Sequence, residues 1–438
     1  RAHLSAGEEP QAVAMQFLPP LSRDPKAAAR EAPAGAHVPY ARHLGDHTIE
    51  TRDGLLVQTI RLRGLLFETA DSEELNYRAE LRDAMLRAIG SSRYALYHHL
   101  VRRRADADLS AEFEDGFSRD LDARWRERLG SRQLYVAELF LTLVRRPLQG
   151  RVGTADRLRN WFSRSTGRNA AQLAGELHAL NTAREALMAA LGHYDPVPLT
   201  TYDEGGDRRS EPLEFYSWLF NAELRLVVLP HGDLGHHVPA RRISFGLDTV
   251  ELGPAGPLPR RFVAMVSIKD WPSRTMPGMF DELARLPFEM TMSQSFAFVE
   301  RREALGKMNL ALRRMRSADD EAVSLREELS IAKDEVAAGR AGFGEHHTTI
   351  AIHAEDLKLL DSHVAEVIAL LADLGINAVR EDIALEPAFW AQFPGNFRYI
   401  ARRGLVSTAN FAGFASLHNF PVGKARRNHW GDAVTLFE

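Results

Sequence analysis

Hydrophobic and polar residues alternate along two stretches near the start of the chain, and Asp53-Gly54 separates them. On the second stretch Ile60 and Leu62 alternate with arginines, which is the period of a half-buried β-strand. An Asp-Gly pair readily supplies the positive φ values of a type I′ turn. The pattern therefore predicts a β-hairpin with its turn at Asp53-Gly54.

A helix is predicted after this hairpin. Asp71 is placed to cap it, with Glu74 three residues on, and Leu81, Met85 and Ile89 recur every fourth residue along one face. A strand, an amphipathic stretch and another strand follow, at residues 94–101, 117–129 and 134–144. This order predicts a compact α+β domain with a mostly antiparallel sheet.

The second half of the chain repeats this theme. A helix over about 170–191 leads to a polar, glycine-containing stretch at 202–211, which is interpreted as a loop and a candidate domain boundary. The strands and helices predicted after it lie at 243–252, 262–269, 280–286 (helical), 288–293, 348–353, 360–375 (helical) and 376–379. Two modules of similar element order predict a duplicated ferredoxin-like unit with antiparallel sheets.

Two long helical stretches interrupt the second module at about 298–338. Apolar residues recur along each at heptad-like spacing: Leu305, Met308, Leu312 and Met315 on the first, and Leu325, Leu329, Ala332 and Val336 on the second. A break near residues 317–320 separates them. This pattern predicts an antiparallel helical hairpin that projects from the domain.

The predicted domains are an arm at 1–36, a first α+β domain at 37–205, a second at 206–385 and a connector at 386–438. The arm is rich in Ala, Pro and Arg and lacks periodicity, so an extended arm and a disordered tail both fit it. Because the chain opens on Arg1 instead of Met, we expect residues to be missing from its front.

Composition narrows the class of protein. The 438 residues are 45% hydrophobic and 26% charged, which is typical of globular domains, and the length fits two or three of them. A net charge of -4 argues against a surface that coats nucleic acid. Cysteine is absent, which excludes disulfides and thiolate metal sites. No apolar stretch approaches the roughly 20 residues that span a bilayer, and no signal-peptide pattern opens the chain, so a cytoplasmic or peripheral protein is expected.

The sequence predicts no catalytic or metal site. The histidine clusters are His98-His99, His236-His237, and His346-His347 with His353; neighbouring strand residues point to opposite faces, and none of the clusters has the spacing of a metal signature. Gly423-Lys424 resembles the end of a phosphate loop. His418 stands where that pattern needs glycine, and Ala425 stands where it needs Ser or Thr. No catalytic, cofactor-binding or metal-binding residue is therefore assigned.

Two segments remain as candidates for interaction. Phe389, Trp390 and Phe393 precede Pro394-Gly395-Asn396, where Pro-Gly fits the centre of a type II turn and the aromatic rings are expected to anchor it to a core. The second is a basic cluster with a tryptophan: Lys424, Arg426, Arg427 and Trp430. It could contact nucleic acid or form a solvated connector, and the connector is the favoured interpretation.

Four segments together resemble the CagE/TrbE/VirB family of type IV secretion ATPases. They are Val38-Pro39-Tyr40 through Gly45-Asp46-His47 to Phe67-Glu68-Thr69-Ala70-Asp71; Leu96 to Arg102; Phe389-Trp390 with Pro394 to Arg398; and Asn410-Phe411-Ala412 with Gly431-Asp432 and Leu436-Phe437. Their order and spacing carry the resemblance, which spans residues 37–438. In the family, the last of these segments leads into a RecA-like motor domain.

The resemblance implies the docking and oligomerisation region of an ATPase that energises pilus assembly and the export of DNA or protein. It also implies a cytoplasmic protein, peripheral on the bacterial inner membrane. Expected partners are inner-membrane secretion subunits, other secretion ATPases and further copies of the chain, as dimers or a hexamer. ATP and Mg²⁺ are expected for the full-length protein only. A stand-alone structural adaptor and a nucleic-acid-binding module are the alternatives.

Overall fold

A computed structural model describes residues 32–105, 112–130, 133–146, 170–256, 258–272, 274–317, 323–421, 423, 429 and 431–433. The chain divides into two compact units, residues 1–33 and 34–438. The predicted arm therefore falls almost wholly outside the described residues. Every helix and strand given below belongs to the second unit.

Helices and a mainly antiparallel sheet make up this unit, which confirms the α+β class. The strands are β1 (Tyr40–Leu44), β2 (Thr48–Thr51), β3 (Leu56–Leu62), β4 (Leu65–Leu66), β5 (Tyr94–Ala105), β6 (Leu134–Arg145), β7 (Pro196–Pro198), β8 (Thr201–Glu204), β9 (Asp207–Ser210), β10 (Ile243–Phe245), β11 (Val250–Leu252), β12 (Arg261–Asp270), β13 (Met290–Val299), β14 (Phe343–Ala354), β15 (Asn377–Arg380), β16 (Gly404–Ser407) and β17 (His418–Asn419). The α-helices are α2 (Ser72–Ile89), α3 (Gly116–Gly130), α5 (Ala170–Ala190), α6 (Glu211–Asn221), α7 (Arg301–Ser317), α8 (Val323–Ala337), α9 (Leu357–Asp373), α10 (Leu385–Ala391) and α11 (Thr408–Phe414). Short 3-10 helices are η1 (Ala34–Ala36), η2 (Gly192–Tyr194), η3 (Leu234–His236), η4 (Asp281–Arg285) and η5 (Phe397–Tyr399).

A single antiparallel sheet joins the two halves of the sequence. Its main path runs β1-β2-β3-β6-β5-β13-β14-β12-β11-β10, while β7, β15 and β16 pair with β3, β12 and β14 respectively. The pairing of β5 with β13, from Met290 opposite Arg102 to Ala297 opposite Ala95, links strands that the sequence assigned to different modules. Because these strands belong to one continuous sheet, the sheet does not separate the two predicted modules. The duplicated ferredoxin-like unit and the domain boundaries remain predictions.

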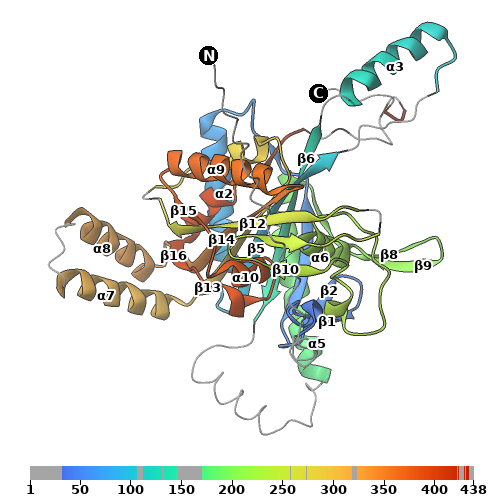
Figure 1. Cartoon of the computed structure of the whole chain (residues 1–438). Helices are drawn as coiled ribbons and strands as arrows, with labels where there is room; N and C mark the ends of the chain where they lie inside the picture. Colours follow the sequence, from blue (N-terminus) through green and yellow to red (C-terminus); the bar gives the residue numbers. More distant parts are fainter. Residues whose placement is uncertain are drawn as a thin grey trace, which may run out of the picture. The chain divides into compact units, whose positions relative to one another are not determined.

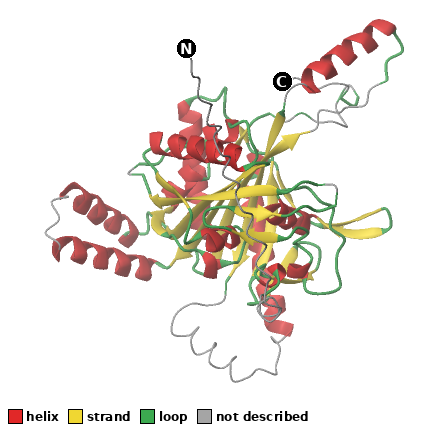
Figure 2. Ribbon diagram, viewed as in Figure 1, coloured by secondary structure: helices red, strands yellow, loops and turns green. Residues whose placement is uncertain are grey.

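Helices cover both faces of the central strands, as Figures 1 and 2 show. One face packs against α2, α5, α9 and α11 through residues such as Leu86, Leu187, Leu360 and Phe411. The other face packs against α6 and α10. Both faces of β13 are therefore buried: Thr291 is covered as well as its neighbours Met290 and Met292, and its hydroxyl oxygen accepts a bond of 3.1 Å from the indole N–H of Trp218 on α6.

The hairpin at Asp53-Gly54 exists, but its turn is not type I′. Only Gly54 has a positive φ (+76°), and its N–H bonds to Thr51 O at 2.9 Å, while Thr51 N–H bonds to Leu55 O at 2.9 Å. These bonds describe a longer loop in which a left-handed glycine ends the turn. Aspartate before glycine suits this loop equally well, which is why the dipeptide alone did not fix the turn type.

Helix α2 begins where predicted, because Asp71 accepts a bond of 2.8 Å from Glu74 N–H. Its buried face is displaced by one residue, since Leu81 is exposed while Arg82 and Leu86 are buried. Arg82 donates to the hydroxyl of Tyr194 at 2.6 Å and to Ala412 O at 3.3 and 3.4 Å. These partners allow an arginine to lie in the core.

The stretch at 202–211 is not a loop. It forms the β8–β9 hairpin, whose two turn residues Gly205 and Gly206 have φ of +63° and +89°. Ser210 then caps α6, a core helix that the sequence reading missed. Two smaller corrections apply nearby: residues 243–252 form two short strands around Gly246, and residues 281–285 form a 3-10 helix.

The helical hairpin is confirmed. Figure 1 shows α7 and α8 side by side and pointing away from the sheet. Ala304 and Met308 on α7 pack with Val336 on α8 to form a small core of their own, separate from the two cores that flank the sheet. The two helices of the hairpin are thus held together by their own apolar core, and their other faces point outward.

Candidate functional site

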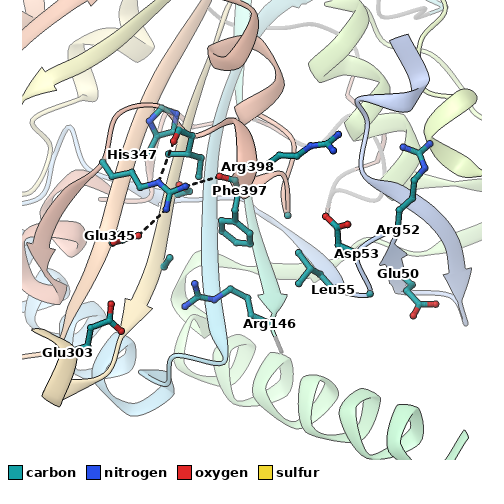
Figure 3. Close-up of a pocket in the computed structure, with 16 residues that line it drawn as sticks. Glu50, Arg52, Asp53, Leu55, Arg146, Glu303, Glu345, His347, Phe397 and Arg398 are labelled. Atoms are coloured by element: carbon teal, nitrogen blue, oxygen red, sulfur yellow. Dashed lines mark hydrogen bonds and ion pairs between the residues drawn. The ribbon is translucent and has the colours of Figure 1, made fainter. Parts of the chain in front are cut away.

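A cavity of about 850 Å³ is the main candidate site (Figure 3). Its walls are the β2–β3 hairpin, the segment 395–403 and the first turn of α7. Ser295 and Ala297 of β13 and His347 of β14 line it from the sheet. Two elements singled out from the sequence, the Pro394-Gly395 turn and the helical hairpin, therefore border one cavity.

The Pro394-Gly395 segment is a type II turn, as predicted. Gly395 has a φ of +94°, and Asn396 N–H bonds to Phe393 O at 3.0 Å. Gly395 lines the cavity, whereas Asn396 is buried behind it. The Asn396 side chain donates to Trp390 O at 2.9 Å and to His37 O at 3.0 Å, so it ties the turn to the start of the unit.

The aromatic residues before the turn anchor it to the core. Phe389 and Trp390 are each 1% exposed and belong to the apolar cluster that includes α6. The ring of Trp390 stacks on His37, with centroids 4.9 Å apart, and His37 in turn contacts the hydroxyl of Tyr399 at 2.6 Å through Nδ1. His37, the residue just before the first family-like segment, is thus in contact with the third.

We expect Asn396→Ala to lower the free energy of unfolding by about 1–3 kcal/mol, because the buried carbonyl oxygen of Trp390 and the half-buried carbonyl oxygen of His37 would both lose their donor. Urea unfolding would measure the change. Asn377→Ala is the matched control: Asn377 is exposed and its amide bonds to Asp270 at 2.7 Å, so the expected change is within about 0.5 kcal/mol. Equal effects of the two substitutions would contradict the bridging role of Asn396.

An ion-pair network closes one side of the cavity. The carboxylate of Glu345 on β14 forms ion pairs with Lys307 of α7 at 2.7 Å and with Arg403 at 3.2 Å. Burial alone would raise the pKa of Glu345, but the hydrogen bonds and positive charges of these two groups outweigh it and hold the pKa below its usual value. Arg403 also donates to Phe397 O at 2.9 Å. The base of the helical hairpin is therefore joined to the turn segment through Glu345.

Two buried polar side chains reach the cavity with bonding capacity left over. Arg146, at the end of β6, is 8% exposed, and its Nε lacks a partner. His347 is 4% exposed, and its Nδ1 bonds to Arg402 O at 2.8 Å while its Nε2 lacks a partner. Burial lowers the pKa of His347 to about 4, so the ring is neutral at pH 7. Sequence reasoning singled out neither group as part of a site.

Of the other candidate histidines, His98, His99, His346 and His353 lie in the core, whereas His236 and His237 are exposed. His98 and His99 point to opposite faces of β5, as expected: His98 meets Gln294 at 3.2 Å and His99 bonds to Gln392 O at 2.8 Å. Burial lowers the pKa of His98 to about 3. Among the residues that the structure describes, no three His, Asp or Glu side chains are grouped to hold a metal ion.

The basic cluster of Lys424, Arg426, Arg427 and Trp430 lies outside the described residues. Its role, like the interaction role of Phe389, Trp390, Pro394, Gly395 and Asn396, stays a prediction. The pair Arg145-Arg146 follows the predicted strand 134–144, but a charged residue at the end of a strand is ordinarily exposed, so the sequence carried no signal that Arg146 is buried.

Two family models match the chain. One, described as the CagE, TrbE, VirB family, component of type IV transporter system, covers residues 198–402. The other, described as the N-terminal domain of the type IV secretion system ATPase VirB4/TrbE, covers residues 47–152. This chain belongs to the CagE/TrbE/VirB family. The resemblance drawn from the four sequence segments is thereby confirmed.

Individual relatives agree with this assignment. The type IV secretion system protein virB4 of Bartonella quintana is 33% identical over 412 residues, which are 93% of this chain and 52% of the relative. Protein virB4 of Rhizobium radiobacter is 32% identical over 92% of this chain and 50% of its own length. The type IV secretion system protein PtlC of Bordetella pertussis is 30% identical over 93% and 50%. The chain thus spans about half the length of these curated relatives.

Proposed function

We propose that this chain is the docking and self-association region of a type IV secretion ATPase. The whole protein would hydrolyse ATP with Mg²⁺ and energise pilus assembly and the translocation of DNA or protein substrates. It would work on the cytoplasmic side of the bacterial inner membrane, in contact with membrane subunits, with other secretion ATPases and with copies of itself. Family membership supports the general role, since the matched relatives are type IV secretion proteins.

The observation that carries the docking role is the shared border of the turn and the hairpin. The Pro394-Gly395 turn is held rigidly by Asn396, and α7 is fixed to the same cavity wall through Lys307 and Glu345. A rigid concave surface beside a projecting arm is suited to receiving another protein. Within the described residues no helix is long and apolar enough to cross a bilayer.

Charge reversal on α8 tests this proposal. Glu327, Glu328 and Asp334 are exposed on α8, away from its packed residue Val336. We expect the triple Lys variant, made in the natural gene of the bacterial host, to lose most of its co-purification with the inner-membrane secretion subunits. The reason is that charges at an interface set its specificity, and like charges brought together oppose association.

The matched control reverses Glu366 and Asp373 on α9, which are also exposed but lie on a different helix. This variant should co-purify as the wild type does, and both variants should show wild-type thermal unfolding. Normal assembly of the α8 variant would refute the docking role of the hairpin.

A further inference from the structure

Arg146 is a buried cation whose charge is not balanced locally. Its Nη2 donates to Phe298 O at 2.8 Å and to Tyr94 O at 3.2 Å, both of them neutral acceptors. Among the described residues no carboxylate lies within ion-pair distance of it. Burying a charge is costly unless it is paired. A residue in this position is therefore stabilised when an anion from outside the fold reaches it.

The geometry leaves a place for such an anion. Figure 3 shows Arg146 beneath Phe397, with its guanidinium directed toward the side of the cavity that holds Glu303 and Glu345. The guanidinium carbon lies 5.7 Å from the centroid of the Phe397 ring, which steadies the planar group. Glu345 and Glu303 are both committed to Lys307, at 2.7 and 3.0 Å. Their negative charges act on Arg146 from a distance and partly offset the lowering of its pKa by burial, but neither carboxylate lies within ion-pair distance of it.

His347 supplies the opposite kind of group in the same cavity. A neutral imidazole has one N–H donor and one acceptor nitrogen. Its Nδ1 lies 2.8 Å from a carbonyl oxygen, that of Arg402, so the proton resides on Nδ1 and Nε2 is the acceptor. That acceptor is buried and lacks a partner. A ligand that fits both groups must bring an anion for Arg146 and an N–H for His347.

The charge of the lining limits which ligand this is. Four arginines and four carboxylates line the cavity: Arg52, Arg146, Arg398 and Arg403, with Glu50, Asp53, Glu303 and Glu345. A nucleotide or a nucleic acid strand would bring several negative charges against this balanced set. One carboxylate carried on a peptide backbone, which also supplies N–H groups, satisfies the buried guanidinium of Arg146 and the acceptor nitrogen of His347 together.

We propose that this cavity binds an acidic residue in an extended peptide segment of a docking partner, with Arg146 as the carboxylate anchor and His347 as an acceptor for a peptide N–H. This inference rests on the proposed docking function and adds the chemical class of the segment that is recognised. Bidentate pairing of a guanidinium with a carboxylate is strong and directional, which suits an anchor at the bottom of a cavity.

Binding is tested with defined peptides. Fluorescein-labelled, capped Gly-Ala peptides carry one central Asp, Glu, phosphoserine, Asn or Gln, and fluorescence polarisation measures their affinity for the protein. We expect the Asp or Glu peptide to bind at least about 10-fold more tightly than its amide counterpart. Arg146→Gln should remove this difference, whereas Arg225→Gln, which changes an exposed arginine outside the cavity lining, should change affinity less than about 2-fold.

Two further variants separate binding from folding. Arg146→Lys keeps the charge but not the fork of donors, and Ala297→Phe fills the cavity while leaving Arg146 in place. Both variants should bind the acidic peptide at least about 10-fold more weakly, and the circular dichroism spectrum of each should match that of the wild type. Equal affinity for acidic and amide peptides would overturn the proposal. A preference for phosphoserine that inorganic phosphate abolishes would overturn it too, because the site would then recognise phosphate.

The full protein in its host distinguishes this inference from the docking function. We expect Arg146→Gln to reduce co-purification with the membrane subunits, as the α8 charge reversal does. If Arg146→Gln docks normally while the α8 variant does not, the peptide-anchor inference fails and the docking function stands. If both variants dock normally, both proposals fail.

Discussion

Replacing Trp390 with alanine should lower the free energy of unfolding by about 3–5 kcal/mol, which is a large fraction of the roughly 5–15 kcal/mol that stabilises a typical domain. The side chain is 1% exposed, and its neighbours cannot collapse into the space because several are rings held by other elements. Phe220 of α6 lies 6.0 Å from it and Phe389 lies 5.1 Å from it, between centroids. Loss of the Trp390 ring also removes the surface on which His37 stacks.

Chemical denaturation followed by circular dichroism would measure this loss. Phe117→Ala is the matched control, because Phe117 on α3 is 77% exposed, and an exposed substitution changes stability by less than about 0.5 kcal/mol. A loss under 1 kcal/mol for Trp390→Ala would show that the 389–396 segment is not anchored as described. The Asp or Glu peptide should also bind the variant less well, since Gly395 and Phe397 line the cavity that this anchor positions.

Local signals in the sequence were sufficient to predict the elements that are defined by residues close together in the chain. The N-cap Asp71, the type II turn at Gly395 and the helical hairpin each depend on residues a few positions apart. Helix α6 was missed for the opposite reason: nine of its residues are buried, so it lacks the polar stripe that gives a helix its period. The β8–β9 hairpin was missed because its polar strands resemble a loop until Gly205-Gly206 is considered as a two-residue turn.

The candidate site was less accessible from the sequence than the fold. Its turn was identified, since proline and glycine mark it. Arg146, His347 and Glu345 come from β6 and β14, which lie more than 190 residues apart and are brought together only through β5 and β13. The residues around Arg146 in the sequence do not indicate that its side chain lies beside Phe397 and has no carboxylate as an ion-pair partner. Pairing across a sheet decides that, and pairing register is a property of the whole fold.

Buried histidines should make this protein sensitive to mild acid. Burial lowers the pKa of His98, His346 and His353 to about 3, and that of His99 and His347 to about 4, from an ordinary value of 6.5. The folded state therefore favours the neutral rings. Their full contribution to stability is present above about pH 6.5, and it is lost as the pH falls from there toward 4 and then 3, because the unfolded chain binds the protons first.

The expected effect is large because each such histidine withdraws about 1.4 kcal/mol per pH unit within this window. Two or three of them acting together remove much of the stability of a typical domain by about pH 5. Thermal melts at intervals between pH 7.5 and 4.5 would show a steep fall in the melting temperature that begins near pH 6.5. A melting temperature that is flat down to pH 5 would contradict the burial of these rings.

His353→Gln isolates one of these titrations. Both ring nitrogens of His353 lack partners, so this change removes a titrating group without breaking a hydrogen bond. We expect the stability of this variant to fall less steeply below pH 6.5. The slope of the unfolding free energy against pH should decrease by the amount that corresponds to about one bound proton. Asn377→Ala is the control, since Asn377 is exposed and does not titrate, and it should leave the slope unchanged. A slope unchanged by His353→Gln would mean that water reaches this ring in the folded state and that the acid sensitivity arises at the other four.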